Sequence, residues 1–142
     1  MIAPDQQVVT ILLIVLFIGL VLFFVLAMLR RRSSGLNTDK YRSYWLKIEN
    51  SLDYKNPMTY QMAVLSADKL LDRAMSDCGI PGNTMGDRLK ASKSRFSNIN
   101  DVWYAHKLRN RIAHEPNVSL NFVTTKKALL IFKKALKELG AI

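Results

Sequence analysis

Apolar residues recur at the spacing of an α-helix in every strongly patterned part of residues 38–142. The first predicted helix is capped by Thr38, and its inward stripe consists of Tyr41, Tyr44, Trp45, Ile48 and Leu52. The second begins at Asn56-Pro57 and stops at Gly79, and its inward stripe consists of Ala63, Ala67, Leu70, Leu71, Ala74 and Cys78. The pattern predicts an all-α domain.

Three further helices are predicted after the loop that contains the sequence IPGNT. A short helix with a weak apolar face runs from Met85 to about Arg95 and is capped by Thr84. The next begins near Asn100 and ends at His114, before Glu115-Pro116. The last runs from about Asn121 to Leu139 and is closed by Gly140, with inward residues Ala128, Ile131, Phe132, Ala135 and Leu139. Because the connections are short, we expect an antiparallel up-and-down bundle of four to five helices.

The segment 8–29 has a different pattern, with no charged residue among its 22 positions. As a helix it would be about 33 Å long, enough to span a bilayer. Three arginines follow at 30–32, whereas residues 1–7 carry only Asp5, so the positive-inside rule puts the N-terminus outside. The predicted order is a short outer segment (1–7), a transmembrane helix (8–29), a basic linker (30–37) and a cytoplasmic helical domain (38–142). We expect a single-pass protein of the cell (inner) membrane.

A cleavable signal peptide is the alternative for this segment. It would need a basic start, a shorter apolar core and a cleavage site of small residues, and the sequence has none of these. The single cysteine, Cys78, agrees with a reducing compartment.

The sequence LRNRIAHE at residues 108–115 puts an arginine on the apolar side of a predicted helix. At about 100° per residue, Arg109 falls inside an inward arc of roughly 140° that is formed by Val102, Ala105, Leu108, Ile112 and Ala113. His114 lies on the border of that arc. An arginine at a core boundary is costly unless it is paired or bound by an anion, which makes this border a candidate site.

An ordinary structural explanation stands beside the functional one. Arg109 could form an ion pair with a carboxylate such as Asp68 or Glu49, and His114 could be a favourable cation at a helix C-terminus. For His106 we expect a half-buried packing role rather than a ligand role.

Arg109, Asn110 and His114 match a known pattern, in which an arginine is followed directly by a polar residue and, four to six residues later, by a histidine. In this respect the chain resembles the HEPN domains (higher eukaryotes and prokaryotes nucleotide-binding) over roughly residues 38–140. Many members of that family are metal-independent endoribonucleases whose site combines two copies of the motif across a dimer interface. The resemblance implies a homodimer, and an antitoxin-like protein partner is possible for such enzymes.

Carried onto this chain, the resemblance implies three catalytic residues. His114 would be a general acid or base in the attack of a ribose 2′-hydroxyl on the neighbouring phosphodiester. Arg109 would stabilise the phosphorane, and Asn110 would orient the imidazole or the phosphate. The products would be a 2′,3′-cyclic phosphate and a 5′-hydroxyl, and no metal or other cofactor is expected. The sequence contains no HExxH, cysteine pair, Walker-type loop or carboxylate cluster that suggests another chemistry.

The formal net charge is +10, and removing three arginines at 30–32 and Asp5 leaves +8 for the rest of the chain. Such an excess favours RNA or anionic lipid as a partner. Candidate phosphate-binding residues are Lys107, Arg111, Lys126, Lys133 and Lys137. A solvated helix face that only limits aggregation is the competing explanation for the lysines of the last helix.

Two other functions remain open at this stage. One is a non-catalytic module that binds a nucleotide, RNA or a protein through Arg109 and His114. The other is a membrane-surface scaffold that uses its basic face against acidic headgroups.

Overall fold

The computed structural model describes residues 6–30 and 35–142. The predicted outer segment (1–7) and basic linker (30–37), including Arg31 and Arg32, therefore lie partly outside the described residues. The chain divides into two compact units, Met1–Ser33 and Ser34–Ile142.

The first unit contains helix α1 (Gln6–Arg30). Its stretch Gln6–Leu26 has a mean hydropathy of 3.4 and no residue buried by the protein, so the helix is long and apolar enough to cross a membrane. The hydroxyl of Thr10 donates a 2.8 Å hydrogen bond to the Gln6 carbonyl, so it is satisfied within the helix.

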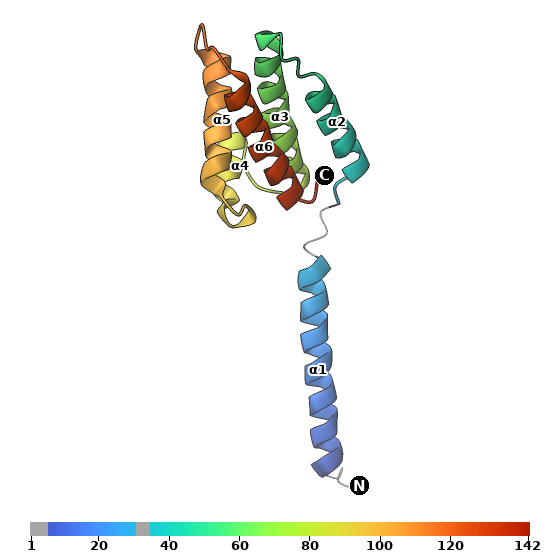
Figure 1. The fold of residues 1–142 in the computed structure, drawn as a ribbon. Coiled ribbons are helices and arrows are strands. Elements are labelled where there is room, and N and C mark those ends of the chain that lie inside the picture. The colour runs from blue at the N-terminus through green and yellow to red at the C-terminus, as the bar shows by residue number, and fades with distance from the viewer. Residues whose placement is uncertain (1–5, 31–34) are drawn as a thin grey trace. The chain divides into compact units, whose positions relative to one another are not determined.

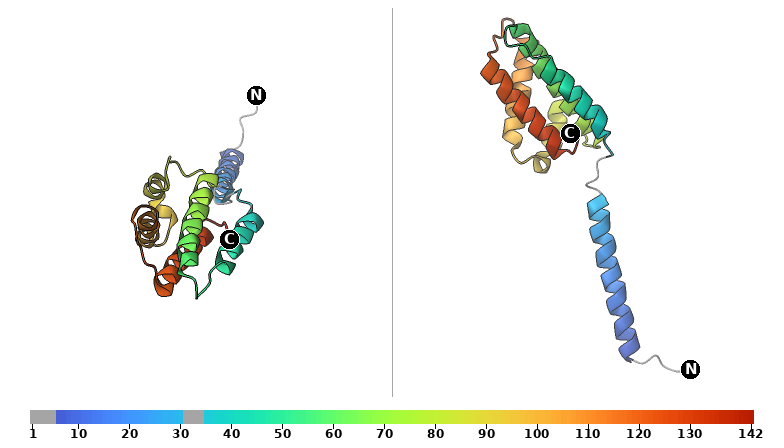
Figure 2. Two further views of the ribbon diagram at one scale, coloured as in Figure 1. Left: turned by 90° about the horizontal axis from the view of Figure 1, so that it is seen from above. Right: turned by 45° about the vertical axis from the view of Figure 1, so that its right-hand side comes forward.

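Helices are the only regular secondary structure in the described residues of the second unit. It consists of α2 (Thr38–Asn50), α3 (Pro57–Asp77), α4 (Met85–Ala91), α5 (Ile99–His114) and α6 (Phe122–Glu138), with a 3₁₀ turn at Lys93–Arg95. Helix α3 is central, because it packs against α2, α4, α5 and α6 (Figures 1 and 2). Helices α5 and α6 also pack against each other.

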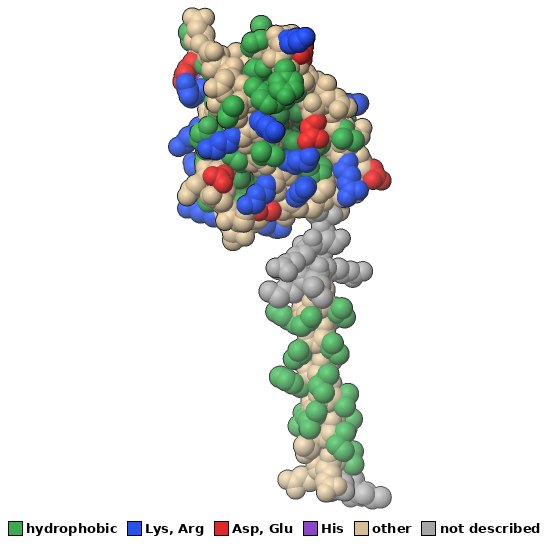
Figure 3. Space-filling view, in the orientation of Figure 1, with side chains coloured by type: hydrophobic (Ala, Val, Ile, Leu, Met, Phe, Trp, Pro, Cys, Tyr) green, Lys and Arg blue, Asp and Glu red, His purple; other side chains and the backbone are tan. Residues whose placement is uncertain are grey.

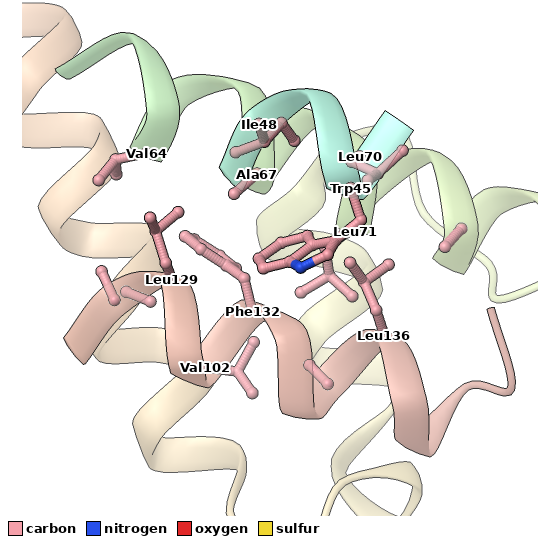
Figure 4. Close-up of a cluster of buried hydrophobic side chains, with 14 of the residues drawn as sticks. Trp45, Ile48, Val64, Ala67, Leu70, Leu71, Val102, Leu129, Phe132 and Leu136 are labelled. Carbon is pink, nitrogen blue, oxygen red and sulfur yellow. The ribbon is translucent and has the colours of Figure 1, made fainter. Parts of the chain in front are cut away.

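One apolar core joins these helices (Figure 4). Phe132 of α6 and Leu71 of α3 are fully buried, and Trp45 of α2 packs beside them. Val102 of α5 lies beside Phe132 in the same cluster (Figure 4). Because α2, α3, α5 and α6 all contribute, the core fixes the position of α5 against α3.

The helix boundaries agree with most of the predicted caps. Asn56 accepts a hydrogen bond from the Met58 amide, Thr84 forms a capping box with Asp87, and Asn121 caps α6. Two predicted caps are wrong by one or two positions. Asn37, not Thr38, caps α2. Asn98, not Asn100, caps α5, because its side chain accepts from the amides of both Asn100 and Asp101.

The predicted inward stripes are largely confirmed, with a few corrections. The ring of Tyr44 was expected inside, but the side chain is 46% exposed because α2 packs mainly against α3 and buries a narrower stripe. Leu52, Cys78, Ile112 and Ile131 are only partly buried, and Ala113, which was expected on the inward arc of α5, is exposed. The short helix ends at Ala91 rather than near Arg95, and the residues that follow form the 3₁₀ turn.

Replacing Phe132 with alanine should lower the free energy of unfolding by about 3–5 kcal/mol, because it removes a fully buried ring and leaves a cavity. The matched control is Leu130→Ala on the same helix, whose side chain is 58% exposed and whose loss should cost well under ~1 kcal/mol. Urea unfolding of both variants measures the difference, and equal losses would contradict this core.

The carboxyl group of Asp77 should make stability depend on acid pH. A hydrogen bond from the Tyr41 hydroxyl (2.8 Å), together with Arg73, holds the pKa of Asp77 below its ordinary value of 3.8. Such a group stabilises the fold above its unfolded pKa, and the contribution is lost as the pH falls through the folded pKa. Asp77→Asn should therefore be less stable than wild type at pH 7, with a difference that shrinks below about pH 4. Urea unfolding across pH tests this, and a pH-independent difference would be the opposing result.

Candidate functional site

A buried carboxylate lies at the contact between α3 and α5. Asp68 is only 4% exposed, because it belongs to the inward face of α3 together with Ala67 and Leu70. Its Oδ1 lies 2.8 Å from Nδ1 of His106, which is itself buried on α5. Since a carboxylate accepts, Nδ1 of His106 is the donor.

Arg109 meets the same carboxylate one helical turn further along α5. Its Nε lies 3.4 Å from Oδ2 of Asp68, and its side chain is 35% exposed. The Nε–H of Arg109 and Oδ2 of Asp68 form an ion pair but not a hydrogen bond. The buried Nε–H therefore has no acceptor among the residues that the structure describes. The side chain of Arg109 is therefore partly exposed, while its Nε–H is buried and unused.

Asn110 closes a ring of four side chains. Its amide nitrogen lies 3.2 Å from Nε2 of His106, and its Oδ1 accepts a 3.1 Å hydrogen bond from Nη1 of Arg109. With Nδ1 of His106 protonated, Nε2 is an acceptor and the amide N–H is the donor. Asp68, His106, Asn110 and Arg109 thus fix one another's orientation, and we call them the Asp68 ring.

The Asp68 ring lines one wall of a groove between α3, α4 and α5, with a volume of about 1160 Å³. Other lining residues include Lys69, Lys90 and Trp103. Helix α4 is tied to α3 by an ion pair between Arg88 and Asp72 at 3.2 Å. The loop before α4 needs glycine at position 82, where φ is +148° and a Cβ atom would lie 2.7 Å from the Arg88 amide nitrogen. The charges along the groove are mixed, because Asp72 and Asp87 accompany Lys69 and Lys90 in its lining.

His114 does not belong to this groove. It is the last residue of α5 and is exposed, whereas Arg109 and Asn110 line the groove. His114 follows Arg109 by five residues. This spacing separates the two side chains by about 140° around the helix axis and by about 7.5 Å along it. The predicted catalytic residues are therefore brought together only in part within one chain.

The predicted phosphate-binding residues also lie outside the groove. Lys133 donates a 2.6 Å hydrogen bond to Glu49, and Arg111 pairs with Glu115 at 3.3 Å. Burial alone would raise the pKa of Glu49, but the bond from Lys133 and nearby positive charges lower it. The remaining three, Lys107, Lys126 and Lys137, are exposed. Figure 3 shows many Lys and Arg side chains on the face where α6 lies, and no histidine there.

Sequence reasoning found part of this site. The ion pair between Arg109 and Asp68 is confirmed, and the alternative with Glu49 is wrong because Glu49 pairs with Lys133. The role of His106 was missed, since it is a hydrogen-bonded member of the ring and not only a packing residue. The available signal was a carboxylate on the inward stripe of α3, together with the i, i+3, i+4 spacing of His106, Arg109 and Asn110.

No family model matches this chain, and comparisons with curated proteins and with solved structures found no significant match. Within residues 6–30 and 35–142, no group of three or more His, Cys, Asp or Glu side chains is arranged to hold a metal ion.

Asp68→Ala should destabilise the domain by about 3–5 kcal/mol, because it leaves the partly buried charge of Arg109 and a buried His106 without their partner. The matched control is Glu115→Ala, which breaks an exposed ion pair with Arg111 and should cost less than ~1 kcal/mol. Chemical denaturation gives both values. A loss for Asp68→Ala no larger than that of the control would show that the ring does not hold α5 against α3.

Proposed function

We propose that residues 38–142 form a HEPN-like domain, anchored in the cell membrane by α1, whose homodimer cleaves RNA without a metal ion. The observation that carries the proposal is the guanidinium of Arg109, fixed at a groove wall by Asp68 and Asn110 while about a third of its side chain stays exposed. A rigid, permanently charged group of this kind suits a phosphate whose charge increases in the transition state.

The position of His114 supports a composite site. The imidazole is exposed at the end of α5 and lies far around the helix from Arg109, so a second copy of the motif is needed to complete the site. In the proposed dimer, His114 of one copy removes the proton of the attacking 2′-hydroxyl and the partner's His114 protonates the leaving 5′-oxygen. Asn110 keeps Arg109 oriented toward the phosphate.

The membrane arrangement belongs to the same proposal. The N-terminus lies outside, α1 crosses the membrane once, and the domain is cytoplasmic. Within the domain, α2, α3, α5 and α6 run in alternating directions in Figure 1, which supports the antiparallel up-and-down bundle. Anchoring would favour dimers, because two domains confined to a membrane plane meet at a raised effective concentration.

A second candidate is a non-catalytic module that binds RNA, a nucleotide or an antitoxin-like protein partner. Two observations favour it: Asp68 compensates the charge of Arg109, and His114 stands outside the groove. A binding module would use the same groove for affinity alone.

The deciding experiment is incubation of the full chain, in nanodiscs of neutral lipid, with labelled single-stranded RNAs in EDTA. The wild type should cleave RNA and leave 2′,3′-cyclic phosphate ends. His114→Ala should lower the cleavage rate by about 100-fold or more, as expected for loss of a general acid or base, while RNA affinity stays unchanged.

The control variant is Glu115→Gln, an exposed change beside His114 that should leave the rate within about twofold. RNA binding without cleavage by the wild-type dimer would instead establish the binding module. Equal cleavage rates for wild type and His114→Ala would contradict the proposed role of His114.

A further inference from the structure

We propose that a single RNA strand bound at Arg109 continues across α3 into a second, cationic groove between α2 and α3. This inference rests on the proposed function, because it extends the substrate path away from the Asp68 ring.

The second groove has a volume of about 640 Å³ and carries an excess of positive charge. Its lining includes the cations Lys40, Lys47, Lys69 and Arg73, against a single carboxylate, Asp77. That carboxylate is already used, since it accepts from the Tyr41 hydroxyl at 2.8 Å and from Nε of Arg73 at 3.1 Å. Within the described part of the chain, Lys40, Lys47 and Lys69 form no ion pair, so their charges remain available for phosphates.

The two grooves adjoin along α3. Met62, Ser66 and Lys69 line both of them, and these residues follow one another at i, i+4 and i+7 on the exposed face of the helix. Ser66 has the smallest side chain of the three, so the ridge between the grooves is lowest there. A strand that leaves Arg109 can cross at Ser66 and meet Lys69 on the way.

An exposed aromatic ring lies in the second groove. Tyr44 is 46% exposed, and Nζ of Lys47 lies 5.6 Å from the centre of its ring. Cations that follow a groove, combined with an aromatic face for base stacking, are the features that bind single-stranded nucleic acid without sequence preference. The side chain of Tyr44 was expected in the core, and its exposure makes its aromatic ring accessible for stacking against a base.

The lysine face of α6 is less suited to an RNA strand. Lys133 is engaged by Glu49, and the other lysines of that helix alternate with exposed apolar side chains such as Val123 and Leu130. The groove between α2 and α3 combines unpaired lysines, an aromatic ring and a shared border with the groove at Arg109.

The test measures binding of the full chain, in neutral nanodiscs, to 2′-O-methyl oligouridylates, which lack the attacking hydroxyl. Lys40→Glu/Lys47→Glu should weaken binding of a decamer by about tenfold or more. It should also reduce the slope of log affinity against log salt by about 0.7 for each phosphate that the variant no longer neutralises. Ser66→Trp should weaken the decamer similarly by blocking the crossing. Binding of a trimer, which fits the groove at Arg109 alone, should change by less than about twofold in Lys40→Glu/Lys47→Glu, because neither lysine lines that groove.

The matched control is Lys55→Glu/Lys93→Glu, which makes the same charge change at two exposed residues outside both grooves. The path is wrong if both test variants bind the decamer like wild type, or if the control loses as much affinity as they do. It is also wrong if Lys40→Glu/Lys47→Glu loses affinity only for anionic vesicles or an acidic peptide. Cleavage by wild type with unaltered decamer binding in the variants would overturn the path and leave the proposed function standing, whereas no RNA binding by wild type would overturn both.

Discussion

The burial of the Asp68 carboxylate is the constraint on which the rest of the site depends. A carboxylate removed from water is costly unless charge and hydrogen bonds compensate it, and here both come from α5. His106 and Arg109 can reach Asp68 together only when one border of α5 faces α3. The contacts of His106 and Arg109 with Asp68 therefore set the rotation of α5 about its axis. The apolar contacts of Val102 and Leu108 favour the same rotation.

That rotation decides what the groove contains. With His106 turned toward α3, Asn110 and Arg109 follow on the same border and line the groove, while His114 points elsewhere at the helix end. The charge balance is mixed, because Lys69 and Lys90 stand near Asp72 and Asp87 in the same lining. In the proposed function, Arg109 is a fixed contact for one phosphate, and a second copy supplies the acid or base for chemistry at that phosphate. The compensating charge of Asp68 also explains how an arginine can remain in this position when no ligand is bound.

Local signals made much of the fold predictable. Side-chain caps such as Asn56, Thr84 and Asn121, and the stop at Glu115-Pro116, act within a few residues of the helix end that they define. The Asp68 ring was harder to predict. Helical spacing shows which residues of α5 lie on the same side of the helix, but it does not show which residue of α3 contacts them. The predicted burial of Tyr44 was wrong for a similar reason. Its spacing places it on the apolar stripe of α2, but the width of the buried stripe depends on how many helices pack against α2.

The central claim is that Arg109 receives a phosphate while Asp68 continues to hold it. The most direct measurement is the side-chain Nε–Hε resonance of Arg109 in an NMR titration of the full chain with a nucleoside 2′,3′-cyclic phosphate. We expect a saturable shift of that resonance in wild type and no such shift of the Arg111 resonance, which belongs to an exposed ion pair. A resonance of Arg109 that stays unchanged at saturating ligand would contradict the claim, because the arginine would then serve only as the partner of Asp68.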